Sequence, residues 1–223
     1  DLRTWFLAIY LVADTKSGIS AKQLQRTTGV TYKTAWRMMK LIRSGMKDNT
    51  PLLTGHVEAD ETFFKPKAWR NSRLPKVRGL EGSEVIVGFV ERGGRVKVKH
   101  IPGTGAASIQ KALKEFVAPG SHLYTDGGRA YVSSRKNGYD HTAQIHWDKN
   151  FKAGENNFIV HAEPATQYIE GFWSQLKRGI YGVYRHCDKK YLQSYCEEYA
   201  WRYSNRKSEV PLFDLLLKRA MQA

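Results

Sequence analysis

The first fifty residues repeat hydrophobic side chains at the three- and four-residue spacing of an α-helix. A first helix is predicted over residues 2–13, and its apolar face consists of Leu2, Trp5, Phe6, Ile9 and Tyr10. Ser20 is a favourable N-cap for a second helix, which Gly29 ends, and Thr31 caps a third. The inward face of the third helix is predicted to hold Ala35, Trp36, Met39 and Ile42. This helix, turn and helix pattern predicts a helix-turn-helix, whose second helix lies in the major groove of DNA.

From Gly55 onward the pattern becomes that of β-strands. Strands are predicted over residues 56–64, 85–90 and 95–99, the last two joined as a hairpin at Gly93 and Gly94. A helix follows, with an apolar face of Ile109, Ala112, Leu113, Phe116 and Val117. A short strand over residues 122–125 then leads into Asp126. Three strands, a helix and a strand are the opening order of a ribonuclease H-like α/β fold.

Two further helical patterns complete the chain. Residues 163–184 carry one apolar stripe, made of Ile169, Phe172, Trp173, Leu176 and Ile180. Glu170 lies beside this stripe, and Lys177 lies two turns further on nearly the same face. The aromatic residues after Lys189 follow a helical spacing that favours core packing over base stacking, and residues 212–217 form a final packed helix or a subunit interface. We therefore predict a helix-turn-helix domain over residues 1–50 and a ribonuclease H-like domain with C-terminal helices over residues 51–223.

The net charge of the chain says more about its function than its length does. The 223 residues are 41% hydrophobic and 12% aromatic, enough for a core, but Lys and Arg number 36 against 21 Asp and Glu, a net charge of +15. Such an excess attracts a polyanion, nucleic acid first and an anionic membrane second. No stretch approaches the roughly 20 apolar residues that span a bilayer. The two cysteines are too few for a disulfide framework or a cysteine-based zinc site, and we expect a cytoplasmic, nucleoid-associated protein.

Two basic segments are candidates for DNA contact. The outward residues of the third predicted helix are Tyr32, Lys33, Arg37 and Lys40. The alternative for them is the solvated face of any small helical bundle. The acid-free segment 65–78 directly follows the first strand, and it is either a solvated loop or a grip on the DNA backbone. Its candidate residues are Lys65, Lys67, Arg70 and Arg73.

Three acids lie at positions where a predicted strand or helix can orient their side chains: Asp60 in a strand, Asp126 at the end of a strand and Glu170 on a helix. Such carboxylates can hold two Mg²⁺ or Mn²⁺ ions for phosphoryl transfer. Each acid alone also has a simpler explanation, as an edge-strand charge, a turn former before Gly127 and an exposed helix residue. Together, in this order on a +15 chain, they favour the catalytic interpretation.

These residues resemble a known family, the DDE transposases of bacterial insertion sequences, in particular the ISXO-type group related to the Merlin elements. The resemblance covers nearly the whole chain. It rests on residues 18–24 and 33–36 of the first module and on residues 57–62, 124–127 and 169–179 of the second. Members often carry a Gly-Gly-Lys run after Asp-Glu-Thr, whereas this chain has Phe63 to Lys67 there. A zinc ribbon that usually begins the family is absent from the chain, which suggests a start downstream of it.

The resemblance implies that Asp60, Asp126 and Glu170 are the catalytic triad and hold two Mg²⁺ or Mn²⁺ ions. Lys177 would contact a phosphate near the scissile bond, with Arg178 beside it, and His161 matches a histidine whose role stays open. The implied reaction cleaves the transposon ends and joins the freed 3′-hydroxyl to target DNA, carried out by a homodimer or higher oligomer. Two alternatives remain open, a non-catalytic regulator derived from a transposase and a structure-specific nuclease of the same fold.

Overall fold

The computed structural model describes residues 1–65, 82–143, 166–185 and 187–221. Within these ranges, no helix combines the length and the apolar character that crossing a membrane requires. By contacts, the chain divides into a helical unit, residues 1–49 and 174–223, and a sheet unit, residues 50–173. Each unit is described below by itself.

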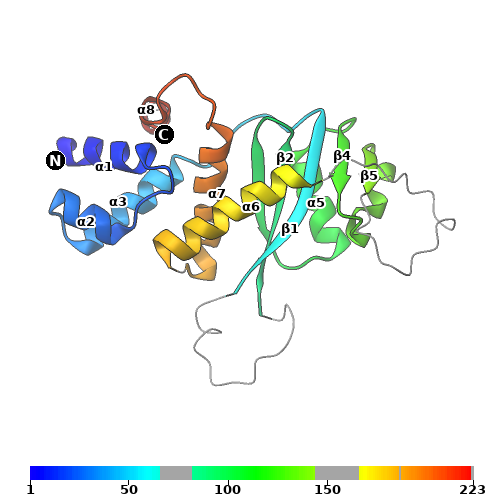
Figure 1. Ribbon diagram of the computed structural model, residues 1–223, viewed down its shortest axis with the longest axis horizontal. Coiled ribbons are helices and arrows are strands. Elements are labelled where there is room, and N and C mark those ends of the chain that lie inside the picture. Colours follow the sequence, from blue (N-terminus) through cyan, green and yellow to red (C-terminus); the bar gives the residue numbers. More distant parts are fainter. Residues whose placement is uncertain (66–81, 144–165, 186, 222–223) are drawn as a thin grey trace. The chain divides into compact units, whose positions relative to one another are not determined.

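The sheet unit is built on one mixed five-stranded sheet with the order β3-β2-β1-β4-β5 (Figure 1). The strands are β1 (His56–Phe64), β2 (Glu84–Glu91), β3 (Val96–Ile101), β4 (His122–Thr125) and β5 (Asp140–Ala143). Neighbours β1, β2 and β3 pair antiparallel, whereas β4 pairs parallel with β1 and β5 parallel with β4. The predicted mixed α/β class and the first four strands are thereby confirmed.

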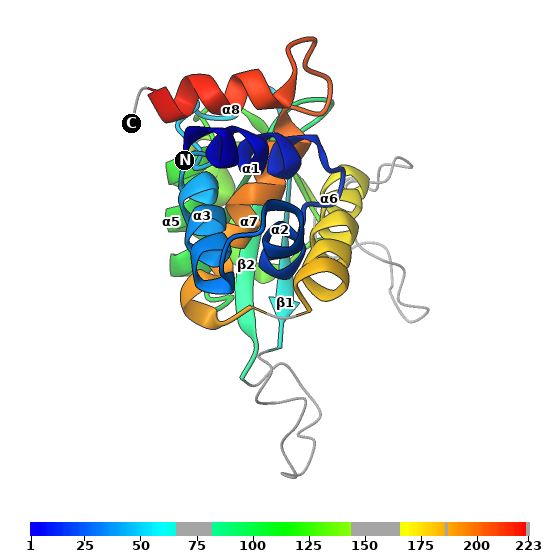
Figure 2. The ribbon, with the colours of Figure 1, turned by 90° about the vertical axis from the view of Figure 1, so that its left-hand side faces the viewer.

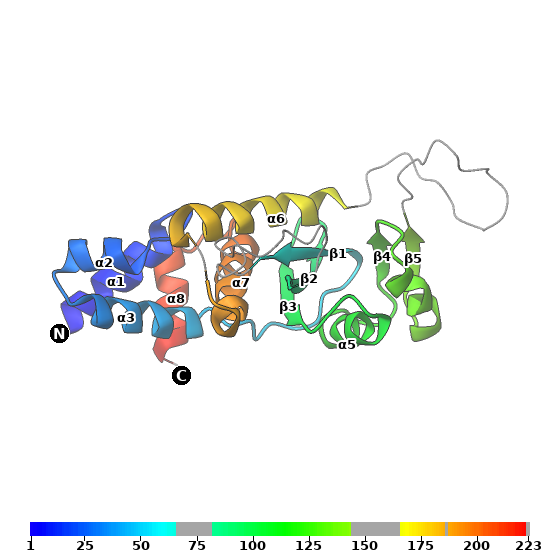
Figure 3. The same cartoon turned by 90° about the horizontal axis from the view of Figure 1, so that it is seen from below.

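The strands carry apolar side chains on both faces of the sheet, and helices therefore cover both faces. On one face, Val57, Ala59 and Phe89 form a core with the inward side chains of α5 (Ala106–Phe116). On the other face, the first half of α6 (Gln167–Arg178) packs its Ile169 and Trp173 side chains over Gly88. Figure 3 shows α5 and the start of α6 on opposite sides of the strands. The second face is the one that also carries Glu58 and Asp60, because alternate residues of a strand point the same way.

The helical unit contains α1 (Leu2–Asp14), α2 (Ala21–Thr28), α3 (Tyr32–Ser44), α7 (Lys189–Ser204) and α8 (Leu212–Met221) (Figure 2). The predicted boundaries of α2 and α3 are confirmed. The side-chain oxygens of Ser20 and Thr31 accept N–H bonds from Gln23 and Thr34, and Gly29 adopts a left-handed φ of 74° between the helices. Glycine takes this conformation without the steric cost that a Cβ brings.

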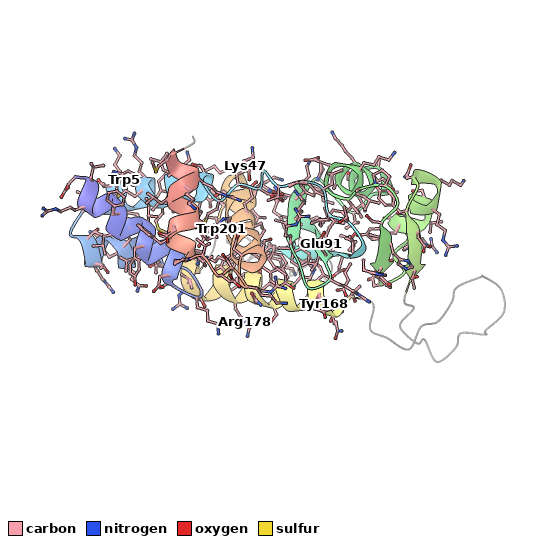
Figure 4. All side chains as sticks on the ribbon, turned by 90° about the horizontal axis from the view of Figure 1, so that it is seen from above. Trp5, Lys47, Glu91, Tyr168, Arg178 and Trp201 are labelled. Atoms are coloured by element: carbon pink, nitrogen blue, oxygen red, sulfur yellow. The ribbon has the colours of Figure 1, made fainter. Side chains whose placement is uncertain are left out.

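The core of the helical unit draws on both ends of the chain. Ile9, Leu24 and Met39 of the first three helices pack with Trp201 of α7 and Leu216 of α8. Figure 4 labels Trp5 and Trp201, which both belong to this cluster. The aromatic pattern of α7 is therefore a core pattern, as predicted. The C-terminal helices thus group by contact with residues 1–49, whereas the division into domains at residues 50 and 51 stays a prediction about which segments fold independently.

Three local features differ from the sequence analysis. The helix predicted over residues 163–184 is α6, which is followed by a π-helical stretch, Gly179–Tyr184; residues 163–165 lie outside the described part. Strand β5 and the 3₁₀ segment before it were not predicted, because four residues, Asp-His-Thr-Ala, carry little hydrophobic pattern. Trp36 is half-buried instead of fully inward, and Met38 takes part in the core.

Candidate active site

Strand pairing brings two of the three predicted acids to neighbouring positions. In the parallel pair of β1 and β4, His56 lies opposite His122 and Glu58 opposite Tyr124. Continued by two residues, this register sets Asp60 beside Asp126, which follows the last residue of β4. Asp60 belongs to the sheet face that α6 covers, and Asp126 follows the strand in which Tyr124 lies opposite Glu58 on that face. Asp126 is exposed, and its Oδ1 accepts the main-chain N–H of Gly128 at 3.2 Å.

Asp60 is half-buried under the first half of α6. Its Oδ2 accepts the indole N–H of Trp173 at 3.0 Å, a bond that joins positions 113 residues apart. The residue opposite Asp60 on β2 is Gly88. A Cβ at Gly88 would lie 2.6 Å from the Trp173 ring and 2.9 Å from Ile169, so glycine leaves the space that the indole occupies.

Glu170 lies in the first turn of α6, where negative charge is favourable to the helix dipole. Its side chain is exposed, and its Oε1 accepts the hydroxyl of Thr166 at 2.9 Å. Each of the three acids thus has one oxygen engaged by a donor from this chain. The structure places Asp60, Asp126 and Glu170 within the sheet unit.

The carboxylates influence one another's protonation. The pKa of Asp60 is raised to about 6, because burial and the negative charges of Asp126 and Glu170 raise it more than the bonds from the main chain of Glu61 and from Trp173 lower it. The neighbouring Glu61 points to the opposite sheet face, where its Oε1 accepts the hydroxyl of Tyr131 at 2.5 Å. Burial, with the charges of Asp60 and Asp126, raises the pKa of Glu61 to about 7. An excess of negative charge therefore accumulates around Asp60.

The donor chemistry of this group suits hard cations, which prefer carboxylate oxygen. Within the described ranges, however, no group of three or more His, Cys, Asp or Glu side chains is arranged to hold a metal ion together. Mutual repulsion at Asp60 is what a bound cation would relieve.

The predicted DNA-binding residues fall into three groups. Tyr32, Lys33, Arg37 and Lys40 are all exposed on α3. Lys65 is exposed directly after β1, whereas Lys67, Arg70 and Arg73 lie outside the described residues, as does His161, whose role the sequence left open. Lys177 is half-buried and Arg178 is exposed in the last turn of α6, whose two ends are labelled by Tyr168 and Arg178 in Figure 4.

Sequence reasoning missed three residues of this site. Glu58, Gly88 and Trp173 contact the elements that carry the acids, although none was predicted to do so. The sequence offered a signal for Trp173, because this residue lies within residues 169–179, one of the segments on which the resemblance rests. The signal for Glu58 was weaker: it is a charged residue in an otherwise apolar strand.

Comparison with known proteins gives a family match over most of the chain. The family of the ISXO2-like transposase domain matches residues 52–204. A protein of Halobacterium salinarum, described as an uncharacterized protein in transposable element ISH50, is 26% identical over 184 residues, 75% of this chain. The chain spans 62% of that relative's length. An uncharacterized transposase-like protein of Haemophilus influenzae is 26% identical over 123 residues, which cover 54% of this chain and 92% of the relative.

Among solved structures, a chain of the simian T-cell lymphotropic virus intasome in complex with PP2A regulatory subunit B56 gamma aligns with 88% of this chain. The alignment covers 74% of that chain with a TM-score of 0.43 and 17% sequence identity. At this level of similarity, the comparison supports no conclusion about this chain.

Proposed function

The chain belongs to the family of ISXO2-like transposase domains, and from this premise we propose that it is a metal-dependent DNA transposase with Asp60, Asp126 and Glu170 as its catalytic carboxylates. The observation that carries the proposal is the register of β1 and β4, which when continued by two residues sets Asp60 beside Asp126, and the charges of Asp126 and Glu170 both raise the pKa of Asp60. The three acids come from three elements separated in sequence. The strand order, with three antiparallel strands followed by parallel ones, supports a ribonuclease H-like fold.

Asp60 is the central acid in this proposal. Together with Asp126 and Glu170 it would hold the divalent ions. When bound, Mg²⁺ or Mn²⁺ activates the attacking oxygen and stabilises the leaving one. The pKa of about 6 for Asp60 means that acidification below that value favours the protonated acid, which cannot serve as a ligand.

The chemistry consists of two in-line displacements at phosphorus. In the first, a water oxygen attacks a phosphodiester at the element end, the P–O3′ bond breaks, and the leaving 3′ oxygen takes up a proton. In the second, that 3′-hydroxyl loses its proton, attacks a target phosphodiester and displaces the target's 3′ oxygen. Lys177 and Arg178 would position phosphates during both steps. One carboxylate set serves both because only the nucleophile changes.

DNA would be held mainly by the helical unit. The exposed face of α3 presents Lys33, Arg37 and Lys40 in the second helix of a helix-turn-helix, the element that enters the major groove. Lys65 and the basic segment that follows it would add contacts to the backbone. We further propose that a homodimer or higher oligomer assembles on double-stranded DNA, as the resemblance implies.

One assay separates this proposal from its alternatives. The full chain is incubated with Mg²⁺, a labelled duplex carrying the terminal repeat of its element, and a target plasmid. Joined product supports the transposase, cleavage without joining indicates a nuclease, and a shifted but uncut duplex indicates a DNA-binding regulator. In Asp60→Ala we expect cleavage to be lost while duplex affinity stays within about twofold, because affinity comes mostly from Lys and Arg. Mg²⁺-dependent nicking by that variant would contradict the assignment of Asp60.

A further inference from the structure

Glu58 is a fully buried carboxylate whose two oxygens are both occupied. Its Oε2 accepts the main-chain N–H groups of Tyr168 at 2.8 Å and Ile169 at 3.1 Å, and its Oε1 accepts the Nε of Arg92 at 3.0 Å. Burial raises its pKa, while these three donors oppose the rise. Burying a charged carboxylate is costly unless such donors compensate for the lost water.

The donors on α6 are the amides of its first turn, which have no partner within the helix. Glu58 therefore caps α6 from a strand that lies 110 residues earlier in the chain. Its position relates the catalytic acids to each other. Glu58 lies two residues before Asp60 on the same face of β1, and Tyr168 lies two residues before Glu170 on α6. A single capping contact thus ties together the two elements that carry these acids.

A second contact joins the same two elements further along α6. Trp173 of α6 donates its indole N–H to Asp60, two residues beyond Glu58. In both contacts α6 donates and β1 accepts, and because the donors lie at two places along the first half of α6, they oppose both sliding and rotation of this segment along β1. An indole bond alone would leave the turn that carries Glu170 unanchored.

Arg92 holds Glu58 in the capping orientation. Its guanidinium carbon lies 3.9 Å from the centre of the Tyr124 ring, and the Tyr124 hydroxyl is 3.0 Å from Nδ1 of His56. Glu58, Tyr124 and His56 all lie on the sheet face under α6. The orientation of the Glu58 carboxylate is thus set by contacts on β1, β2 and β4.

We propose that Glu58 is a positioning residue, which fixes the start of α6 and thereby sets Glu170 against Asp60. The proposal rests on the proposed function for its catalytic consequence, since Glu58 itself touches neither substrate nor a reacting atom. Its structural part, the anchoring of α6, stands independently of the reaction.

Two variants and one control test it. Glu58→Ala removes the cap, and Glu58→Gln keeps one carbonyl oxygen as acceptor for the helix amides. The matched control is Glu91→Ala. Glu91, labelled in Figure 4, likewise accepts a main-chain N–H, from Thr54 at 3.0 Å, and pairs with an arginine, Arg95, but it makes neither of these bonds with α6. The readouts are hydrogen exchange at Tyr168 and Ile169 without metal, and kcat and KM for nicking of supercoiled plasmid in Mn²⁺.

For Glu58→Ala we expect exchange at these two amides to rise about fivefold or more, as for a lost helix cap. We expect kcat to fall on the order of 100-fold with KM little changed, because the acids lose alignment. Glu58→Gln should recover most of both, and Glu91→Ala should change neither. If Glu58→Ala does not fold, Glu58→Gln becomes the test. We then expect this variant to lose part of the exchange protection at the two amides and part of kcat.

The proposal is overturned if folded Glu58→Ala keeps the wild-type kcat, if Glu58→Gln keeps all of it where the alanine variant does not fold, or if Glu91→Ala lowers kcat equally. If the wild-type chain and Asp60→Ala nick plasmid alike, the proposed function fails instead. The exchange result then still decides whether Glu58 anchors α6.

A different observation carries a second inference, within the helical unit. The rings of Trp36 on α3 and Tyr191 on α7 meet edge to face, with centres 5.4 Å apart. The ammonium of Lys40 lies 6.0 Å from the Trp36 ring, and that of Lys190 lies 4.9 Å from the Tyr191 ring. Lys40, Trp36, Tyr191 and Lys190 therefore form a continuous row of cations and rings across two helices, which we term the α3–α7 row.

Charge and packing both support a role for this row. The helical unit holds 19 Lys and Arg against 8 Asp and Glu, a net of +11, whereas the sheet unit holds 17 against 13, a net of +4. Most of the excess charge thus belongs to the helical unit. Arg43 of α3 and Glu198 of α7 form a buried ion pair at 2.8 Å, which fixes the two helices to each other beneath the row.

We infer that the first turn of α7 extends the DNA-contacting face of α3, with Lys190 contacting the phosphate backbone beside the groove that α3 enters. This inference rests on the proposed DNA binding and names a part of its surface. An exposed lysine beside a recognition helix positions the duplex without reading its sequence.

The test measures the affinity of Lys190→Ala for the terminal-repeat duplex and for an unrelated duplex over a range of salt. We expect several-fold weaker binding to both and a decrease of about 1 in the slope of log K against log salt, since one phosphate contact is lost. Lys218→Ala, an exposed lysine on α8, is the matched control and should change neither. Equal behaviour of the two variants would overturn the inference, whereas absence of any binding by the wild-type chain would overturn the proposed DNA binding as well.

Discussion

At the scale of single residues, the site depends on one missing side chain. Gly88 lies opposite Asp60 and leaves room for the Trp173 indole, which donates to that acid. The sequence indicated Asp60 because an acid in a strand is conspicuous. It did not indicate Gly88, because the need for glycine arises only when a helix residue 85 positions later packs against it.

For Gly88→Ala we expect a loss of stability of about 1–3 kcal/mol, because the new methyl group overlaps the Trp173 ring and the core must shift. Displacement of the indole should also lower the rate of metal-dependent nicking. Denaturant unfolding and plasmid nicking measure the two effects. Gly171→Ala on α6 is the control, since nothing lies within 4 Å of its Cβ position, and there we expect a gain of about 0.5–1 kcal/mol. Equal stability of both variants would contradict the packing argument.

His141 gives the sheet unit a specific pH dependence. Burial lowers its pKa to about 4, with help from the charges of Arg135 and His122, and its Nε2 is 2.9 Å from the Thr125 hydroxyl. The unfolded chain, with an ordinary histidine pKa near 6.5, takes up a proton more readily than the folded one. The stability that neutral His141 provides is therefore complete above about pH 6.5 and is lost as the pH falls toward 4.

We accordingly expect His141→Gln to flatten the acid side of the stability profile. The difference in unfolding free energy between wild type and variant should shrink by up to roughly 3 kcal/mol from pH 7 to pH 4.5. Urea unfolding at the two pH values measures it. A difference that stays constant would mean that His141 does not resist protonation in the folded state.

At the scale of elements, the most predictable features were those with local causes. The N-caps Ser20 and Thr31 and the turn at Gly29 determine the ends of α2 and α3 through neighbouring residues, so sequence sufficed. The start of α6 is different, because its cap is Glu58 from a distant strand. Contacts of that kind cannot be predicted from residue order alone.

A buried charge cluster joins three elements of the helical unit. Glu198 on α7 accepts Arg43 from α3 and Arg202 from its own helix, and it also accepts the Tyr184 hydroxyl. Arg202 in turn donates to carbonyl oxygens at the end of α1, among them that of Thr15 at 2.8 Å. The charges of the two arginines hold the pKa of Glu198 below its ordinary value despite complete burial.

In Glu198→Ala two buried arginines lose their shared partner. We expect the free energy of unfolding of the helical unit to decrease by about 3–5 kcal/mol. Glu197→Ala, one residue away and partly exposed, should stay within about 0.5 kcal/mol of wild type. Thermal and urea unfolding followed by circular dichroism compare the two. A Glu198 variant as stable as its neighbour would show that the cluster does not hold these helices together.

At the scale of the whole molecule, the sequence and the structure divide the excess positive charge differently. The division at residue 50 assigned +6 to the first part and +9 to the second. Grouped by contacts, the units carry +11 and +4, because the basic C-terminal helices belong with the first fifty residues. Sequence order could not indicate this, since the packing of α7 and α8 against α1 and α3 joins opposite ends of the chain.

The central claim is that Asp60, Asp126 and Glu170 act together as one metal-dependent site. Its most direct test is strand transfer in Mg²⁺ from a pre-cleaved terminal-repeat duplex into plasmid, by the wild type and by Asp60→Asn, Asp126→Asn, Glu170→Gln and the control Glu197→Gln. We predict joined product with the wild type and the control, and none with the other three although each still binds the duplex. Joined product from any one of those three variants would contradict the claim.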